Sequence, residues 1–293
     1  MPGSPYTDLD RPPLDARRLE RALTGPAGPW RRFELVTETG STNADVVAAA
    51  RAGEPAGLVL AAERQTAGRG RRGRGWESPA RAGIATSVLL RPGEAEPDRD
   101  WPAAPPSGYG WLPLLAGVAL TEAVRRLAEL DAGLKWPNDL LLAGRKAAGI
   151  LAEAVPAGEP GEPPAVVLGV GLNVTLRATE LPEPVAGGPP PTSLALAGAA
   201  ATDRDPLLRA LLRGLAGWYD RWRLAGGDVE ASGLRAAYLE HCVTLGRPVR
   251  VLLPSGAELT GTARTVDREG MLVVTTADGV DRPVAAGDVL HLR

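Results

Sequence analysis

An arginine- and glycine-rich segment at Gly68–Gly75 is the part of the chain whose residue types point most directly to chemistry. Its arginines carry guanidinium groups that suit phosphate or carboxylate oxygens, and its glycines let the backbone approach a ligand closely. We expect a flexible loop that is disordered when empty and is ordered by an anionic ligand. A solvated basic loop that binds nothing specific is the alternative reading.

The same segment matches the glycine pattern of dinucleotide-binding folds at Gly68, Gly70 and Gly73, but its surroundings do not fit. A dinucleotide fold turns tightly from a strand into the first glycine and then enters a helix. Here the preceding apolar run ends earlier, at Ala62, and a strand is expected to follow the glycines. Neither lysine of the chain follows the glycines that a Walker P-loop requires. We therefore predict neither type of nucleotide loop.

Two lysines, Lys135 and Lys146, stand among 33 basic residues that are otherwise all arginine. Because an ammonium and a guanidinium are not interchangeable, a retained lysine hints that a compact charge is needed. Lys135 opens a Lys-Trp-Pro-Asn-Asp run in which Pro137 should end a strand and Asn138-Asp139 suits a turn. At that strand end Lys135 could meet a bound carboxylate or phosphate. The alternative is an edge lysine in water.

The run Gly40-Ser41-Thr42-Asn43 reads as the start of a helix, with Ser41 or Thr42 as the N-cap. A cap and nothing more is the simplest reading. A helix N-terminus with free N–H groups and hydroxyls is nevertheless able to accept polar ligand atoms.

The two histidines, His241 and His291, and the single cysteine, Cys242, form no metal-ligand spacing and no Ser/His/Asp set. We therefore predict no metal ligands among the side chains and no covalent nucleophilic catalysis.

Composition narrows the class of protein further. The chain has 293 residues, 44% hydrophobic and 23% charged, with a net charge of −2. This length allows one large and one small domain, and the charge provides no general attraction to nucleic acid or anionic membrane. No signal peptide or long apolar span is visible. We expect a cytoplasmic protein with no membrane partner.

Periodicity and turn residues give the expected elements that would position these groups. Helices are expected near 14–23, 42–52, 112–128, 206–224 and 234–241, and strands at 32–36, 57–62, 83–90, into Lys135, in a following hairpin and through 166–174. Short strands near 249–253, 258–266, 271–275, 280–284 and 288–292 indicate a small all-β barrel. Proline-rich stretches at 91–107, 156–164 and 182–191 read as surface loops without an assigned role.

Five segments, in this order and spacing, resemble the biotin–protein ligase family over about residues 32–293. They are Gly40-Ser41-Thr42-Asn43, the Ala62–Arg74 segment, Lys135–Asp139, Gly144–Leu151 and Gly169–Val174. The resemblance implies an α/β (α+β) fold, with a class II synthetase-like mixed sheet in a catalytic domain at 1–243 and an SH3-like β-barrel at 244–293. It also implies ATP and biotin as substrates with Mg²⁺, and the biotin carboxyl carrier protein or domain of an acyl-CoA carboxylase as acceptor.

The resemblance also assigns site residues. Catalytic roles are implied for Lys135, Arg69 and Arg71. Biotin contacts are implied for Ser41, Thr42, Asn43, Gln65, Gly68, Arg69, Gly70, Arg71, Lys135 and Gly169. Contacts to ATP or the adenylate are implied for Arg71, Arg74, Trp76, Asn138, Lys146, Gly171, Leu172 and Asn173. A monomer or homodimer is expected. The segment before residue 32 is too short for the winged-helix domain of some family members, so we expect no DNA or other nucleic-acid partner.

Two other functions remain open from the sequence. A lipoate–protein ligase shares the fold and the two-step logic, although the Arg/Gly loop and the Lys-Trp-Pro-Asn-Asp run favour biotin. A non-catalytic nucleic-acid-binding module would use the arginine loop, but it should also show a strongly basic face with interleaved aromatics. Trp76 is the one aromatic residue near the loop, and the net charge is negative.

Overall fold

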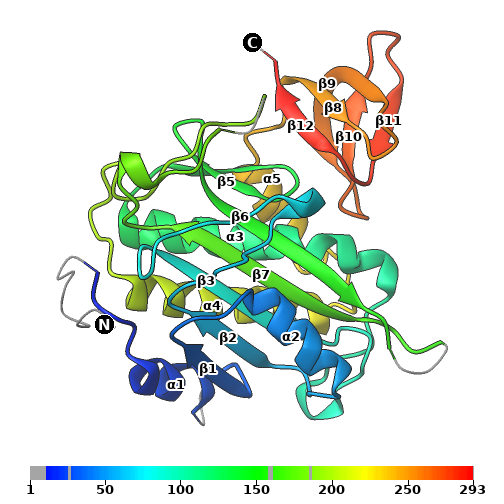
Figure 1. Cartoon of the computed structure of the whole chain (residues 1–293). Helices are drawn as coiled ribbons and strands as arrows, with labels where there is room; N and C mark the ends of the chain where they lie inside the picture. The colour runs from blue at the N-terminus through cyan, green and yellow to red at the C-terminus, as the bar shows by residue number, and fades with distance from the viewer. Residues whose placement is uncertain (1–10, 26–27, 158–160, 185–186, 293) are drawn as a thin grey trace.

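The computed structural model describes residues 11–25, 28–157, 161–184 and 187–292. Residues 158–160 and 185–186, in two of the predicted proline-rich loops, lie outside the described residues. In the described part, a seven-stranded mixed sheet with flanking helices forms the larger body, and a five-stranded antiparallel sheet forms a smaller one at the C-terminal end (Figure 1). The predicted α/β class with a small all-β domain is confirmed.

The large sheet has the strand order β1-β2-β3-β7-β6-β5-β4. Its strands are β1 (Arg32–Val36), β2 (Leu58–Ala62), β3 (Gly83–Leu90), β4 (Ala132–Lys135), β5 (Asp139–Leu142), β6 (Arg145–Val155) and β7 (Ala165–Asn173). β1 and β2 are parallel, and every other neighbouring pair is antiparallel. Since parallel strands need a crossover, the helix between β1 and β2 must pass over one face of the sheet.

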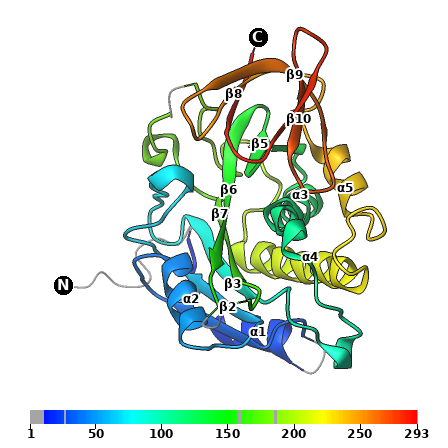
Figure 2. The ribbon, with the colours of Figure 1, turned by 90° about the vertical axis from the view of Figure 1, so that its right-hand side faces the viewer.

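That crossover is α2 (Thr42–Arg51), which covers one face, while α3 (Leu112–Ala128), α4 (Arg204–Leu224) and α5 (Leu234–His241) lie on the other (Figure 2). α1 (Ala16–Thr24) packs on β1 and α4. Short 3₁₀ turns are η1 (Arg71–Gly73), η2 (Pro97–Arg99), η3 (Pro106–Trp111) and η4 (Ala178–Glu180). Among the described residues, we find no helix with the length and apolar character that a bilayer crossing needs.

Strand β7 shows how the sequence divides the two faces of the sheet. Leu168, Val170 and Leu172 belong to the main core with α3 and α4, because alternate side chains of a strand point to opposite faces. The intervening Gly169 and Gly171 face the α2 side. One face is therefore filled by leucine and valine, and on the other the two glycines leave room for the side chains of Asn43 and Trp76 to approach the strand.

The small sheet has the order β11-β10-β9-β8-β12 and is antiparallel throughout. Its strands are β8 (Pro248–Leu252), β9 (Glu258–Val266), β10 (Leu272–Thr275), β11 (Asp281–Val284) and β12 (Asp288–His291). Two buried tryptophans fasten it to the larger body. Trp136 Nε1 donates to the Gly270 carbonyl at 3.0 Å, and Trp111 Nε1 donates to the Arg268 carbonyl at 2.8 Å.

Helix starts are the main departures from the predicted element bounds. α1 begins at Ala16 instead of Leu14, because the Asp15 side chain caps it by accepting from Arg18 N at 3.0 Å. α4 begins at Arg204, with Asp203 as N-cap, so Pro206 lies inside the first turn. Proline is tolerated there because the first-turn N–H groups lack helical partners.

Candidate functional site

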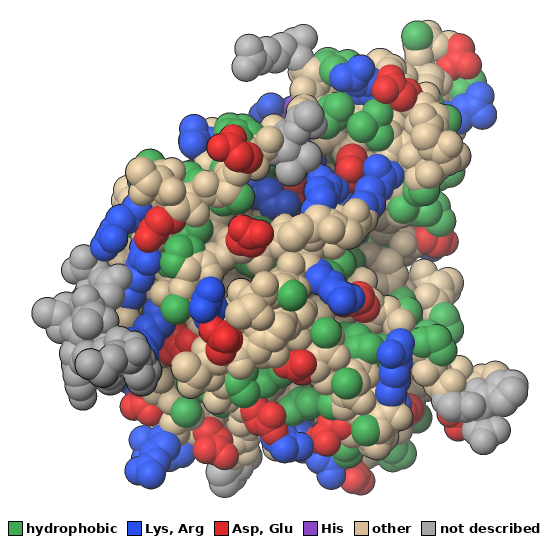
Figure 3. All heavy atoms as spheres, viewed as in Figure 1, with side chains coloured by type: hydrophobic (Ala, Val, Ile, Leu, Met, Phe, Trp, Pro, Cys, Tyr) green, Lys and Arg blue, Asp and Glu red, His purple; other side chains and the backbone are tan. Residues whose placement is uncertain are grey.

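A cavity of about 360 Å³ lies on the α2 face of the sheet, between that helix, the arginine loop and the C-terminal barrel. Basic side chains gather at this junction, beside acidic ones (Figure 3). The residues that line the cavity come from the start of α2, the loop after β2, the β4–β5 turn, β6, β7 and β12. Segments far apart in the sequence therefore meet in one place.

Three glycines of β6 and β7, at positions 149, 169 and 171, form the floor of the cavity. Gly171 of β7 pairs with Gly149 of β6 on one side and with Ala85 of β3 on the other. The Trp76 indole lies over this row, so a Cβ atom at Gly171 would come within 2.5 Å of the ring, and one at Gly149 within 3.3 Å. At Gly169 a Cβ would lie 2.0 Å from Asn43 Oδ1. Glycine is thus required at 169 and 171 by close approach.

Buried polar groups at the start of α2 form one wall. Gln65 Oε1 accepts from Thr42 N at 2.8 Å, and the Ser87 hydroxyl lies 2.8 Å from Thr42 Oγ1 and 2.6 Å from Asn43 Oδ1. Asn43 Nδ2 donates to Glu153 at 2.7 Å. Ser41, Thr42 and Asn43 are all buried. Because both ends of the Asn43 amide have partners, its orientation is fixed.

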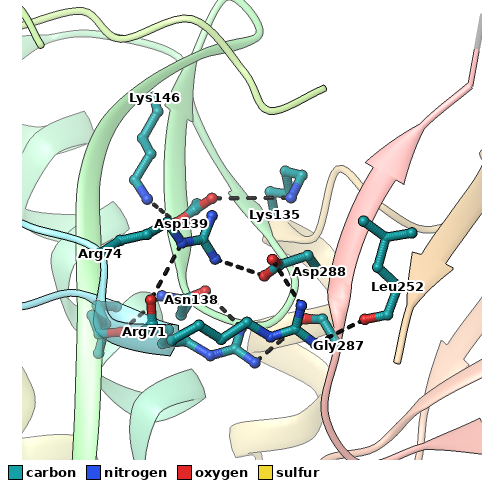
Figure 4. Close-up of polar contacts among 11 residues, drawn as sticks. Arg71, Arg74, Lys135, Asn138, Asp139, Lys146, Leu252, Gly287 and Asp288 are labelled. Atoms are coloured by element: carbon teal, nitrogen blue, oxygen red, sulfur yellow. Dashed lines mark hydrogen bonds and ion pairs between the residues drawn. The ribbon is translucent and has the colours of Figure 1, made fainter. Parts of the chain in front are cut away.

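Both lysines of the chain lie on the cavity wall beside one carboxylate (Figure 4). Lys146 Nζ is 2.6 Å from Asp139 Oδ1, and Lys135 Nζ is 4.0 Å from Asp139 Oδ2. Lys135 is only 8% exposed, which contradicts the alternative of an edge lysine in water. Burial lowers the pKa of Lys135, and the neighbouring Asp139 carboxylate opposes that change.

Lys146 Nζ lies 6.0 Å from the Trp76 ring centroid. The indole therefore connects the glycine floor to the cationic wall.

The arginine loop closes the cavity toward the barrel. Arg71 Nη1 donates to Asn138 Oδ1 at 3.1 Å, and its Nη2 lies 3.4 Å from the Gly287 carbonyl. Arg74 Nη2 lies 2.7 Å from Asp288 Oδ1. Burial lowers the pKa of the Arg71 guanidinium, and the Asp288 carboxylate opposes this most strongly. Lys135 and the loop therefore share one cavity, an arrangement that can receive a carboxylate or phosphate.

Most of the predicted site residues meet at this cavity. Those that line it are Ser41, Thr42, Asn43, Gln65, Arg69, Gly70, Arg71, Arg74, Trp76, Lys135, Asn138, Lys146, Gly169, Gly171 and Asn173. Gly68 and Leu172 are not among them. A Cβ at Gly68 would lie 2.3 Å from the Trp76 carbonyl, so this glycine lets the loop fold on itself. The side chain of Leu172 lies in the core on the opposite face, so the predicted contact of this residue with the nucleotide would have to come from its backbone.

Several cavity residues were not predicted. Asp139 belongs to the Lys-Trp-Pro-Asn-Asp run, so the sequence contained a signal for it, whereas Asp288 of the barrel has no motif around it. The proline-rich stretch was read as a loop without a role, yet Pro189 and Pro191 line the cavity. Lys146 N donates to the Pro190 carbonyl at 2.8 Å, which anchors this stretch beside β6.

Within the described ranges, His, Cys, Asp and Glu side chains nowhere gather in a group of three or more that could hold a metal ion. Asp139 and Asp288, two carboxylates on the cavity wall, already pair with lysine or arginine. A divalent ion would therefore be held mainly by a nucleotide's own phosphate oxygens and water, as Mg²⁺ prefers.

Comparison with known proteins gives consistent matches. Residues 39–173 match the biotin/lipoate A/B protein ligase family, and residues 244–292 match the biotin protein ligase C-terminal domain. The chain is 44% identical to a biotin–[acetyl-CoA-carboxylase] ligase of Mycobacterium tuberculosis (strain ATCC 25618 / H37Rv), over 98% of this chain and 100% of that protein. The bifunctional ligase/repressor BirA of Escherichia coli (strain K12) is 31% identical over 99% of this chain and 82% of its own length.

A solved structure supports the fold. The biotin protein ligase from Aquifex aeolicus in complex with biotin and ATP has a TM-score of 0.69 and 25% identity, over 89% of this chain and 98% of that chain. This match confirms the predicted fold class.

Proposed function

This chain belongs to the biotin protein ligase family, and we propose how its cavity carries out the family's reaction. The protein is an ATP-dependent biotin–[acetyl-CoA-carboxylase] ligase, which activates biotin to biotinyl-5′-AMP and then transfers it to a lysine of a biotin carboxyl carrier partner. One observation carries the assignment of residues to these steps: a single cavity joins the buried polar groups of α2 to the lysines and arginines.

The α2 side of the cavity fits biotin. Ser41, Thr42 and Asn43 present hydroxyl, amide and backbone groups to a small polar ring, with Gln65 beside them. The floor glycines let the Asn43 amide and the Trp76 indole lie close to the sheet, which leaves a concave site with few but well-placed polar groups above them. Biotin would thus point its carboxylate along the sheet toward Lys135.

The cationic side fits the α-phosphate of ATP. Arg69, Arg71, Lys135 and Lys146 line it, and Arg74 completes it at the barrel. Guanidinium groups bind phosphate oxygens through paired hydrogen bonds, while an ammonium acts as a compact charge. Trp76 lies over Gly149 and Gly171, where it can pack on the nucleotide or on the biotin ring.

Adenylate formation needs alignment more than proton removal. A biotin carboxylate oxygen attacks the α-phosphorus of MgATP, a new O–P bond forms, and the bond from the α-phosphorus to the oxygen that bridges to the β-phosphate breaks, which releases pyrophosphate. Lys135 and the loop arginines offset the charge at the α-phosphate, and the carboxylate is already a nucleophile. Enclosure by the loop would also keep water from the mixed anhydride.

The neutral amine of the acceptor lysine then attacks the carbonyl carbon of the adenylate, the bond from that carbon to the AMP oxygen breaks, and AMP and one amine proton leave. We propose the carrier protein or domain of an acyl-CoA carboxylase as the acceptor, with the catalytic domain at 1–243 and the barrel at 244–293. A monomer or homodimer, with no nucleic-acid partner, is part of the same proposal. Mg²⁺ would enter with ATP as part of the substrate.

Incubation with biotin, MgATP and a biotin carboxyl carrier domain tests the proposal. The carrier should gain biotin, and pyrophosphate should be released with biotin and MgATP alone. Lys135→Ala and Arg69→Ala should each lower the rate of pyrophosphate release by roughly 100-fold, since each removes a positively charged side chain from beside the reacting phosphate. Arg126→Ala, at an exposed arginine of α3 on the opposite face of the sheet, is the matched control and should act as wild type.

Lipoate in place of biotin distinguishes the related ligase activity. If the protein prefers to transfer lipoate to a lipoate carrier, the substrate is lipoate and not biotin. The same cavity residues would still be needed. Pyrophosphate release that is unchanged in Lys135→Ala would contradict the roles assigned to the cationic wall.

A further inference from the structure

The arginine loop, Gly68–Gly75, is fastened to the C-terminal barrel at one carboxylate. Arg74 Nη2 lies 2.7 Å from Asp288 Oδ1, and Arg72 Nη1 lies 3.2 Å from Asp288 Oδ2. Arg72 Nη2 also donates to the Leu252 carbonyl at 2.9 Å. Figure 4 shows the Asp288 side chain, at the start of β12, pointing toward the loop. Each oxygen of this carboxylate therefore faces a different loop arginine.

Arg72 differs from the other loop arginines. Arg69, Arg71 and Arg74 line the cavity, but Arg72 does not. Its backbone is left-handed, with φ 55° and ψ 37°, a conformation that is uncommon for a residue with a side chain. The contacts of its guanidinium with Asp288 and the Leu252 carbonyl restrain this residue. Arg72 thus lies where it can hold the loop to the barrel, which we call the tether, and not where it can contact a ligand.

We propose that Asp288 is a positioning residue for the phosphate end of the site. It holds the arginine loop against the cavity through Arg72 and Arg74, and it gives up Arg74 to the nucleotide when the phosphates arrive. The tether through Arg72 remains, because Arg72 lies outside the cavity. The barrel would in this way take part in nucleotide binding without touching biotin.

The charges around the cavity support this division of roles. Asp139 pairs with the two lysines, whereas Asp288 pairs with loop arginines. A phosphate has more acceptor oxygens than a carboxylate and can take over a guanidinium fork. The pairs of Asp288 are partly exposed, with side-chain exposure of 25% for Asp288 and 39% for Arg74, so they can exchange partners readily.

Limited proteolysis with trypsin tests the tether in the absence of any ligand. Asp288→Asn retains every arginine of the loop, so its cleavage sites are unchanged, and it should be cut between 69 and 74 roughly fivefold faster than wild type. Asp281→Asn is the matched control, because Asp281 lies on β11 and pairs with Arg264 instead of the loop. It should be cut at the wild-type rate.

Steady-state kinetics test the role toward the nucleotide, and this arm rests on the proposed function. Asp288→Asn should raise the KM for ATP by roughly threefold to tenfold, while kcat and the Kd for biotin stay within about twofold. Arg72→Ala should give the same pattern although it lies outside the cavity. The double variant should be affected less than the product of the single effects, since both substitutions break one contact.

Asp288→Glu, which keeps the carboxylate, should restore both the slow cleavage and the low KM if positioning is the role. Loss of function in Asp288→Asn together with a lowered Tm of the barrel, and no rescue by Asp288→Glu, would instead mean a structural role and would overturn the proposal. Wild-type cleavage and wild-type KM in Asp288→Asn would also overturn it. If the wild-type protein forms no adenylate, the proposed function fails while the proteolysis still decides the tether.

Discussion

The α2 side of the cavity and the arginine loop are held in place by different contacts. On the α2 side, Thr42 and Asn43 are buried and bonded to Ser87, Gln65 and Glu153, and the glycine floor lies within a seven-stranded sheet. The loop has few packing side chains, and partly exposed arginines hold it through ion pairs and hydrogen bonds.

The difference indicates how the work of binding is divided. Groups that are fixed during folding lose little entropy when a ligand arrives, so the biotin end can be selective. Exposed ion pairs contribute little to stability and exchange partners easily, so the phosphate end can rearrange during a reaction that changes its charge. Four experiments test this difference between the two sides of the cavity.

Gly169→Ala should have the largest effect, on the rigid side. Its Cβ would lie 2.0 Å from Asn43 Oδ1, and neither the sheet nor the bonded amide can move away cheaply. We expect the affinity for biotin to fall roughly 100-fold, measured by isothermal titration calorimetry. Gly217→Ala on α4, where a Cβ meets no atom within 4 Å, is the control and should bind normally. Normal binding by Gly169→Ala would show that this wall is not rigid.

The alkaline pH dependence tests the cationic wall. Burial lowers the pKa of Lys135, while the Asp139 carboxylate raises it. Since loss of the ammonium proton removes positive charge from the cavity, adenylate formation should be present below this pKa and fall about tenfold per pH unit above it. Asp139→Asn should shift this fall to lower pH in a profile of kcat/KM for pyrophosphate release. A fall that stays in place, or moves to higher pH, would contradict the role of Asp139.

Ser87→Ala should have an intermediate effect. The substitution removes the hydroxyl that holds Thr42 Oγ1 and Asn43 Oδ1, so both groups lose orientation. A Kd for biotin raised roughly tenfold is expected, with the KM for ATP unchanged. Ser255→Ala, in an exposed barrel turn, serves as the control. Equal effects on both substrates would mean that the two sides of the cavity are not independent.

Added salt should give the smallest effect, and it should weaken mainly the binding of ATP at the arginine loop. Raising NaCl from about 0.05 to about 0.3 M should increase the KM for ATP roughly threefold, because exposed charges are screened. The Kd for biotin should change much less, since Thr42 and Asn43 are buried and neutral and the Lys135 ammonium that meets the biotin carboxylate is also buried. An equal salt dependence of both constants would remove the contrast.

Much of the fold could be predicted from the sequence because local patterns determine it. The bounds of β1, β3, α3, α5 and β9 agree with the predicted ranges, since each element has clear periodicity and clear ends. The predicted start of α4 was too late, because Pro206 was taken as the first helical residue. The N-cap is Asp203, whose side chain accepts a hydrogen bond from Asp205 N. Both Asp203 and Asp205 are residue types that cap helices, so the sequence alone does not decide which of them precedes the first turn.

The candidate site was predicted only where a motif marks it. Thr42, Lys135 and Gly171 stand in recognisable runs, and all three line the cavity. Ser87 and Asp288 do not, because their importance depends on how β3 and β12 are placed against remote segments. The side chain of Leu172 lies in the core because, within a strand, only alternate side chains face the ligand side, and its predicted contact with ATP stays a prediction.

The pairing of both lysines with Asp139 has a practical consequence for chemical labelling. Guanidinium groups resist most amine-directed reagents, so apart from its α-amino group the chain offers such reagents only Lys135 and Lys146. Lysine acetylation by a mild reagent would therefore report on this cavity alone, and it should slow when a ligand fills the cavity. An enzyme whose own intermediate is an amine-reactive anhydride thus has few amines of its own that this intermediate could modify.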